Sequence, residues 1–211
     1  MVSKSWGKHS FVKNIIMRYN LTEIQNLIRD RRSIKPLKIS TRKVHREQIE
    51  AMIQAANWAP THGYTEPWRF KVFGGKAMQD LMQFNADLYK SKTPEEKFLP
   101  DTYNSFLERA KRVSYIVGVC MKRQESEVIP EVEEIIEIGC AVQNFSLVAA
   151  AYGLGCFWST GGFAFSAEMH EYMKLGPKDR FLGFLYVGYP EGEWPEPTKR
   201  GIWMNKVEWL E

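Results

Sequence analysis

The sequence predicts an α+β protein in which a central sheet is flanked by helices. Segments with apolar residues at helical spacing interleave irregularly with short apolar runs of strand length. The chain has 211 residues, of which 44% are hydrophobic and 26% charged, so one domain can bury a core without disulfides or metal. Aromatic residues reach 13%, which favours a flat-ring pocket or an oligomer interface in addition to a core.

In the first half of the chain we expect three helices and one strand. Residues 21–30 repeat Ile24, Leu27 and Ile28 at helical spacing, and Pro36 prevents that helix from continuing. The other expected elements are a helix over His45–Trp58 stopped by Pro60, a strand over Trp68–Phe73 closed by Gly74-Gly75, and a helix over Lys76–Tyr89.

The second half is expected to hold the longest helix, over Glu131–Tyr152. Acidic residues in its first turns suit a helix N-terminus, and its nearly all-apolar later half is typical of a core or a subunit interface. Residues 91–101 contain Pro94 and Pro100 and predict a loop or lid-like insertion with short helices around it. The remaining expected elements are strands over Val113–Met121, Cys156–Ser159 and Phe181–Tyr189, and a helix over Ser166–Lys174.

Charge, cysteines and targeting signals narrow the function classes. The net charge of +4 is dispersed, with no run of five Lys or Arg, which argues against a nucleic-acid binder. Three widely spaced cysteines in apolar sequence predict free, buried thiols in a reducing compartment, and neither they nor the scattered histidines suggest a metal site. No secretory signal is evident and no stretch approaches the ~20 apolar residues of a membrane span. We therefore expect a cytoplasmic protein with an N-terminal extension, residues 1–20, and one domain, residues 21–211.

A cluster of donors follows the first expected helix: Arg31, Arg32, Ser33 and Lys35. Arginine binds phosphate through a planar fork, and serine adds a neutral donor, so the cluster suits a phosphate. A solvated helix end is the alternative. The glycine-rich cradles of common nucleotide sites and the Gly-x-Ser-x-Gly elbow are absent. Enzymatic chemistry would then belong to a bound organic cofactor.

Four blocks in the order of the chain resemble the FMN-dependent nitroreductase family, in the branch with an Ala-Pro-x-His motif. The match spans about residues 21–211. Its blocks are Arg31-Arg32-Ser33; Ala59-Pro60-Thr61-His62 with Glu66-Pro67-Trp68-Arg69-Phe70; Gln143-Asn144 through Gly153-Leu154-Gly155 to Trp158-Ser159-Thr160-Gly161; and residues 183–190 with Lys199-Arg200. The resemblance implies a central mixed sheet and an interlocked homodimer with two FMN molecules at its interface. It also implies ping-pong electron transfer from NADH or NADPH to a small acceptor such as a nitroaromatic, quinone or enone.

The resemblance further implies roles for individual residues. Flavin N5 carries the chemistry, so no side chain needs to act as acid or base. Lys35 would lie near the pyrimidine edge of the flavin, and Thr61 and His62 would approach from the partner subunit. The phosphate and ribityl chain would be bound by Arg31, Arg32, Ser33 and Arg200, assisted by Lys199, and the isoalloxazine would be flanked by Trp158, Ser159 and Thr160. Each role has a structural alternative. Lys35 could be a surface lysine and His62 a turn residue. Arg200 could be a solvated tail residue and Trp158 a core residue.

One departure from the family pattern affects flavin recognition. Many relatives carry Asn-x-Gln-Pro-Trp, where this chain has Tyr64 and Glu66. An ionised Glu accepts but cannot donate, so we expect Glu66 to pair with a basic residue instead of reading the flavin edge.

Other activities stay open at this point. The fold could serve dehalogenation, flavin fragmentation or flavin binding without turnover. Aromatic residues of the variable insertion, Phe98, Tyr103 and Phe106, are candidates for the outer pocket wall, with core or dimer contacts as the alternative.

Overall fold

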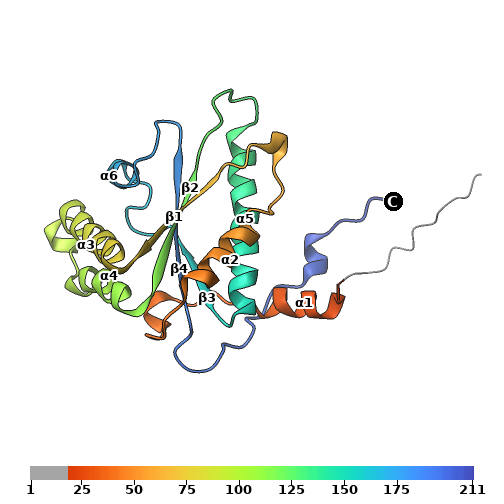
Figure 1. Cartoon of the computed structure of the whole chain (residues 1–211), viewed down its shortest axis with the longest axis horizontal. Helices are drawn as coiled ribbons and strands as arrows, with labels where there is room; N and C mark the ends of the chain where they lie inside the picture. The colour runs from red at the N-terminus through yellow and green to blue at the C-terminus, as the bar shows by residue number, and fades with distance from the viewer. Residues whose placement is uncertain (1–18) are drawn as a thin grey trace, which may run out of the picture.

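The structure is a computed structural model that describes residues 19–211, and the expected extension lies outside this range apart from its last two residues (Figure 1). It has the α+β architecture that the sequence predicts. The α-helices are α1 (Leu21–Asp30), α2 (Arg46–Ala56), α3 (Gly75–Lys92), α4 (Pro100–Arg112), α5 (Glu131–Ala151) and α6 (Ala167–Tyr172). The strands are β1 (Trp68–Gly74), β2 (Tyr115–Met121), β3 (Gly155–Ser159) and β4 (Arg180–Gly188), and short 3₁₀ turns are η1 (Pro36–Lys38), η2 (His62–Tyr64), η3 (Glu95–Lys97) and η4 (Trp203–Lys206).

The sheet has the strand order β1-β2-β4-β3, and every neighbouring pair is antiparallel. The prediction of a mixed sheet is therefore wrong for the described residues. The reason is topological: α5 joins β2 to β3 as two strands of the same direction, but β4 inserts between them and runs the opposite way.

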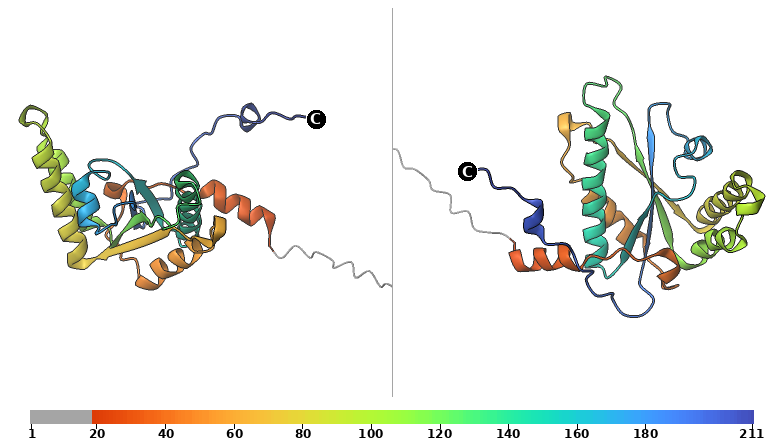
Figure 2. Two further views of the ribbon diagram at one scale, coloured as in Figure 1. Left: turned by 90° about the horizontal axis from the view of Figure 1, so that it is seen from above. Right: turned by 180° about the vertical axis from the view of Figure 1, so that it is seen from behind.

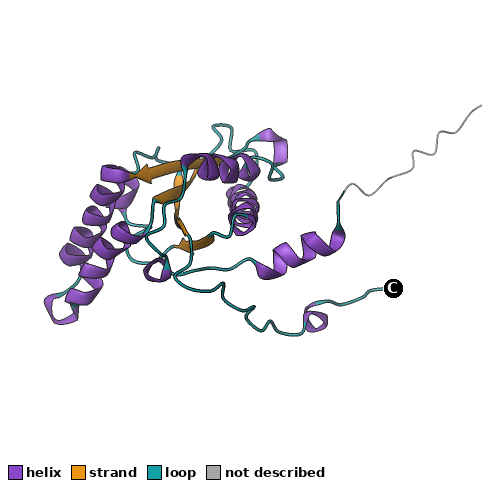
Figure 3. Ribbon diagram, turned by 60° about the horizontal axis from the view of Figure 1, so that its bottom comes forward, coloured by secondary structure: helices purple, strands orange, loops and turns teal. Residues whose placement is uncertain are grey.

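Helices cover both faces of the sheet (Figures 2 and 3). Strand β2 shows how one apolar run serves two cores. Val117 and Val119 join the core with α2 and α5, whereas Ile116 and Cys120 join the core with α3 and α6. Because successive side chains of a strand point to opposite faces, a continuous apolar run marks a strand buried on both sides.

Helix α5 packs one face on α2 and the strands and leaves the other face open. Val132 and Ile136 on that open face are 60% and 61% exposed, and Ile135 is also exposed. By length and composition alone this helix could cross a membrane, so the expectation that no segment comes near a span is wrong for α5. In the structure it is a core helix with a second apolar face that its own chain does not cover.

The region before β2 is more helical than expected. The predicted loop over 91–101 contains only the short turn η3 before α4 begins at Pro100. Proline suits the first turn of a helix because the first backbone N–H groups have no helical partner anyway. Helices α3 and α4 form a hairpin beside the sheet (Figure 1).

Helix α1 and the C-terminal tail leave the body on the same side (Figures 1 and 2). No residue of α1 is buried, although Leu21, Ile24 and Ile28 form an apolar stripe. The tail carries exposed Trp203 and Met204 in η4. Its base is attached to α1, since Trp194 Nε1 donates to the carbonyl of Asp30 at 2.9 Å.

Candidate functional site

The segment after α1 presents its polar side chains on one side. Its backbone is extended, with φ −56° and ψ 131° at Arg31 and φ −57° and ψ 142° at Lys35. Side chains therefore alternate: Arg32 and Ile34 are buried, while Arg31, Ser33 and Lys35 lie toward solvent. Arg31 Nη1 donates to Ser33 Oγ at 3.4 Å, which places guanidinium and hydroxyl side by side. We refer to Arg31, Ser33 and Lys35 as the donor face.

Arg32 differs from its neighbour. It is 9% exposed, and its Nε donates to the carbonyl of Pro195 at 2.9 Å. Its Nη1 donates to the carbonyls of Arg29 and Arg31 at 2.8 and 2.7 Å. Within residues 19–211, only Nη2 of this guanidinium is buried without a partner. Arg32 thus fastens the tail to the end of α1, and its predicted phosphate contact depends on that one remaining nitrogen.

The segment that carries the donor face lies beside β3, one of the two edge strands of the sheet. A Cβ at Gly155 would come within 2.5 Å of Ile34 Cδ1, so the side chain of Ile34 packs directly on the backbone of Gly155. Arg31 is near enough to Cys156 for its charge to act on the thiol, although burial dominates and raises the pKa of Cys156 to about 12. The segment after α1 and the beginning of β3 therefore lie side by side.

Three residues along β3, at roughly 3.3 Å per residue, the strand reaches Trp158. The indole Nε1 donates to the carbonyl of Leu182 at 2.8 Å, which fixes the ring, and the residue is 39% exposed. It is therefore not the core tryptophan of the alternative interpretation. Ser159 is half-buried and Thr160, just after β3, is exposed, so none of the three predicted residues is buried in the core.

The loop of residues 61–66 has an unusual backbone. Gly63, Tyr64 and Glu66 have φ values of +59°, +55° and +42°. A non-glycine residue in this left-handed region costs about 1–3 kcal/mol, and such strain concentrates at functional sites. Tyr64 is 90% exposed, so packing of its side chain does not hold the loop in place.

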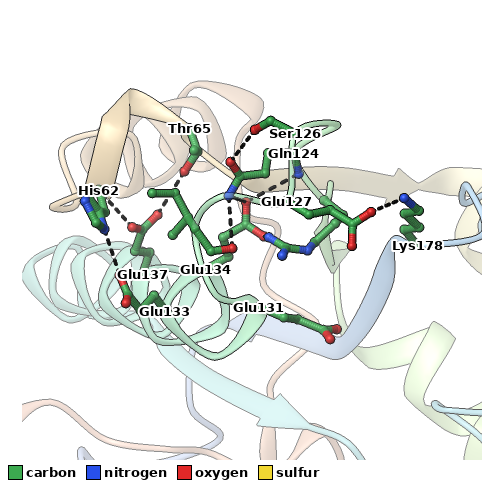
Figure 4. A network of polar contacts seen from close by, with 12 residues as sticks. His62, Thr65, Gln124, Ser126, Glu127, Glu131, Glu133, Glu134, Glu137 and Lys178 are labelled. Carbon is green, nitrogen blue, oxygen red and sulfur yellow. Dashed lines mark hydrogen bonds and ion pairs between the residues drawn. The ribbon is translucent and has the colours of Figure 1, made fainter.

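Carboxylates of α5 hold this loop instead (Figure 4). Glu137, which is 7% exposed, accepts from Thr61 Oγ1 at 3.0 Å and from the amide of His62 at 2.5 Å. It also accepts from Thr65 Oγ1 at 3.4 Å. One turn earlier, Glu133 lies 2.8 Å from Nδ1 of His62. Because an ionised carboxylate only accepts, Nδ1 carries the proton in this pair and Nε2 is left for another partner.

A neighbouring carboxylate of α5 holds a different loop. Glu134 is fully buried and pairs with Arg123, whose Nη1 lies 2.5 Å from its carboxylate. Gln124 also donates to it. The acidic start of α5, predicted from the helix dipole, is thus also a set of loop anchors. Nothing in the sequence signals this function, because each anchor bonds residues that are distant in the chain.

The two parts of the predicted site lie at opposite ends of α5. His62 is held by Glu133 at the beginning of the helix, whereas Ile34 packs on Gly155, just after its end. A helix of 21 residues is about 30 Å long. One chain therefore does not bring Thr61 and His62 together with Arg31, Ser33 and Trp158.

Other predicted residues lie apart from the donor face. Lys199 and Arg200 are on the exposed tail, a few residues beyond the point where Arg32 holds Pro195, and no contact joins Arg200 to Arg31 among the described residues. Glu66 makes no ion pair within residues 19–211, since Arg69 donates to its backbone carbonyl and not to its carboxylate.

The aromatic residues proposed for an outer wall pack chiefly on one another. Phe98 lies 5.5 Å from Tyr89 and 6.3 Å from Tyr103 between ring centroids, and Phe106 lies 6.2 Å from Tyr89. They form a local core in the α3–α4 hairpin. This agrees with the alternative of core contacts and not with an outer pocket wall. Only Phe106 reaches toward the segment after β3, where a Cβ at Gly162 would lie 3.8 Å from its ring.

Comparison with known proteins places the chain in a family. The model of the nitroreductase family matches residues 28–189. A relative from Bacillus subtilis strain 168, provisionally named NAD(P)H nitroreductase YfhC, is 30% identical over 180 residues, which is 84% of this chain and 89% of the relative. The chain therefore belongs to the nitroreductase family. The name of the relative, an NAD(P)H nitroreductase, supports an oxidoreductase.

Solved structures confirm the fold. A nitroreductase-like family protein from Bacillus cereus superposes with a TM-score of 0.78 at 27% identity, over 92% of this chain and 98% of that one. A provisionally named nitroreductase from Desulfovibrio desulfuricans, solved in complex with FMN, superposes with a TM-score of 0.66 at 22% identity, over 92% and 99% of the two chains.

Proposed function

We propose that this chain is an FMN-dependent NAD(P)H oxidoreductase that reduces small acceptors such as nitroaromatics, quinones or enones. The donor face is the observation that carries this proposal. It groups a guanidinium, a hydroxyl and an ammonium on one side of an extended segment, with no carboxylate to neutralise them within residues 19–211. A phosphate ester is an acceptor without donors, so it complements the guanidinium of Arg31 and the hydroxyl of Ser33, and the ammonium of Lys35 is left for the ring.

The residues present fit FMN in chemistry and in layout. Each charge-assisted hydrogen bond to a phosphate contributes about 1.5–3 kcal/mol, so three or four donors would hold a dianionic phosphate, and Arg31 with one more donor would supply about half of that. The buried unpartnered Nη2 of Arg32 lies in the same segment. Trp158, Ser159 and Thr160, further along the adjacent strand, would flank the ring system. FMN bound to a family neighbour supports the assignment.

The chain's own residues would bind and orient, while FMN when bound supplies the redox chemistry. Lys35 would place a positive charge beside the ring and so favour its anionic reduced form. For a two-electron couple, about 1.4 kcal/mol of such preference corresponds to about 30 mV. No side chain has to transfer a proton for this function.

A homodimer explains why the site is divided. The open face of α5 is apolar, and α1 and the tail add further exposed apolar residues. In a two-fold dimer the same patch pairs with itself, and a two-fold axis perpendicular to α5 would make the two facing α5 helices antiparallel. Such a pair would bring Thr61 and His62 of one copy to the donor face of the other.

The visible spectrum of the purified protein tests the proposal. We expect yellow protein with flavin absorption, bleached by NADH or NADPH and restored by an acceptor. Protein that stays colourless and takes up no FMN offered in excess would overturn it. A panel of nitro, quinone and halogenated aromatic acceptors distinguishes reduction from dehalogenation, and FMN that is bound but never bleached would indicate a binding protein.

Light scattering tests the dimer. We expect twice the chain mass for the wild type and the chain mass for Ile136→Asp, because a carboxylate on the open face of α5 would lose its hydration on pairing. A monomeric wild type that still holds FMN would contradict a shared site.

A further inference from the structure

We propose that Glu137 is the positioning residue of the site, fixing the loop of residues 61–66 in its strained conformation before any cofactor arrives. The consequence of this inference rests on the proposed function: Thr61 and His62 are held in position for the flavin of the partner copy before it binds. The fixation of the loop by Glu137 concerns one chain alone and can be tested without flavin.

The bonding of the loop converges on one carboxyl group. Thr61 Oγ1, the His62 amide and Thr65 Oγ1 all donate to Glu137, so the beginning and the end of the loop meet at the same anchor. Thr61 Oγ1 in turn accepts from the amide of Glu66 at 3.1 Å, which closes the loop on itself. Removal of this one carboxylate would leave several donors without their acceptor.

The loop has few other means of support. Tyr64 in the left-handed region is almost fully exposed and contributes no packing. A left-handed run that includes two non-glycine residues is intrinsically unfavourable, so it persists only where surrounding contacts hold it. The hydrogen bonds to Glu137 hold the loop at Thr61, His62 and Thr65. Glu133 holds the imidazole of His62, and Arg69 Nη1 donates to the carbonyl of Glu66 at 2.8 Å.

The anchor also sets the loop relative to the open face of α5. Glu137 directly follows Ile136, which is 61% exposed on that face. A rigid helix with an apolar outer face and a loop bonded to its inner side moves as one piece. The position of Thr61 and His62 relative to a second copy is thereby set by α5 and not by the flexibility of the loop.

The chain offers a matched control in Glu134. It is a carboxylate on the same helix and at least as buried, but it holds Arg123 and the amide of Gln124 and makes no bond to residues 61–66. The variants are Glu137→Ala, Glu137→Gln and Glu134→Ala, with Glu134→Gln as the control if Glu134→Ala fails to fold. Glutamine retains an acceptor oxygen, so Glu137→Gln is the conservative rescue.

Amide hydrogen exchange on flavin-free protein is the first measurement. In Glu137→Ala we expect exchange at His62 and Glu66 to accelerate by about tenfold or more. The His62 amide loses its buried acceptor, and the Glu66 amide bonds Thr61 Oγ1, which is no longer held in place by Glu137. The Gln124 amide should keep its wild-type rate. In the Glu134 variant the Gln124 amide should exchange faster, and His62 and Glu66 should keep their wild-type rates. Unchanged exchange at residues 62–66 in Glu137→Ala would overturn the proposal.

FMN affinity, measured by fluorescence quenching on the same variants, is the second measurement. We expect about tenfold weaker binding in Glu137→Ala, partial recovery in Glu137→Gln, and a change within about twofold in the Glu134 variant. Equal losses in the Glu137 and Glu134 variants would indicate general destabilisation and refute a positioning role. If the wild type binds no FMN, the proposed function fails, while the exchange pattern still decides whether Glu137 fixes the loop.

Discussion

The donor face and the loop of residues 61–66 are both polar, and they differ in how their hydrogen-bonding groups are used. Arg31 and Lys35 of the donor face make no ion pair within residues 19–211, whereas the loop has its amide and hydroxyl donors bonded to Glu137. Cations without a paired carboxylate suit an anion that comes from outside the chain. Donors that are already bonded suit a preformed wall, which gains nothing further from a charged ligand.

The largest effect should follow removal of the main cation of the donor face. Arg31→Ala is expected to weaken FMN binding by about 1.5–3 kcal/mol, or about 10- to 150-fold, because it deletes a charge-assisted bond. Equilibrium titration of the flavin-free protein measures this. Arg29→Ala is the control, since Arg29 pairs with Asp30 and holds the pKa of that carboxyl below its usual value. If Arg31→Ala retains flavin as well as the wild type, the donor face does not bind the phosphate, and the contrast with the loop fails.

Arg32→Ala should affect stability more than binding. It leaves the carbonyls of Arg29, Arg31 and Pro195 without their donor, at a cost of about 1–3 kcal/mol in the free energy of unfolding. Urea denaturation monitored by tryptophan fluorescence measures this cost. An unchanged midpoint combined with a loss of FMN affinity equal to that of Arg31→Ala would assign Arg32 to the phosphate instead.

Tyr64→Gly tests whether the strain in the loop serves function. Glycine removes about 1–2 kcal/mol of left-handed strain and adds about 0.5–1 kcal/mol of unfolded-state freedom, so a net stabilisation of about 0.5–1 kcal/mol is expected. Turnover with NAD(P)H should fall. The control is Lys174→Gly, another left-handed position, with φ +49°, which should stabilise without loss of turnover. If both variants keep full activity, Tyr64 is strained for no purpose in the site.

Ser33→Ala should give the smallest effect. A neutral hydroxyl donor contributes about 0.5–1.5 kcal/mol, so FMN affinity should fall two- to about tenfold. Ser33→Thr keeps the hydroxyl and is expected to bind nearly as well as the wild type. A loss as large as that of Arg31→Ala would mean that the hydroxyl and not the charge dominates the donor face.

Patterns local in sequence predicted most of the secondary structure. The apolar repeats placed α1, α2 and α5 within about two residues of their observed ends, and the run over 113–121 placed β2. Helix α4 was expected only as a short helix around a loop over 91–101, because Pro94 and Pro100 suggested that loop, whereas Pro100 starts a helix of 13 residues. The antiparallel sheet could not be predicted, because the position of β4 between β2 and β3 depends on pairing between distant segments.

The residue types of the donor face were read from the sequence, but the direction in which each side chain points was not. The sequence places Arg31 and Arg32 as equivalents, and only the extended backbone after α1 sends one outward and the other inward. A shift of one residue in the end of α1 would exchange them, and sequence signals do not fix helix ends that closely. The anchoring by Glu137 was missed because its partners are some 75 residues earlier in the chain.

One consequence follows from the placement of the two regions at opposite ends of α5. If the cofactor needs groups from two copies, neither copy alone has a complete cavity for it. Flavin and the second chain must then strengthen each other's binding by the same factor, as linkage requires. Dilution of the flavin-free protein should separate the copies at concentrations where the yellow form remains paired, so flavin supply would govern assembly by mass action.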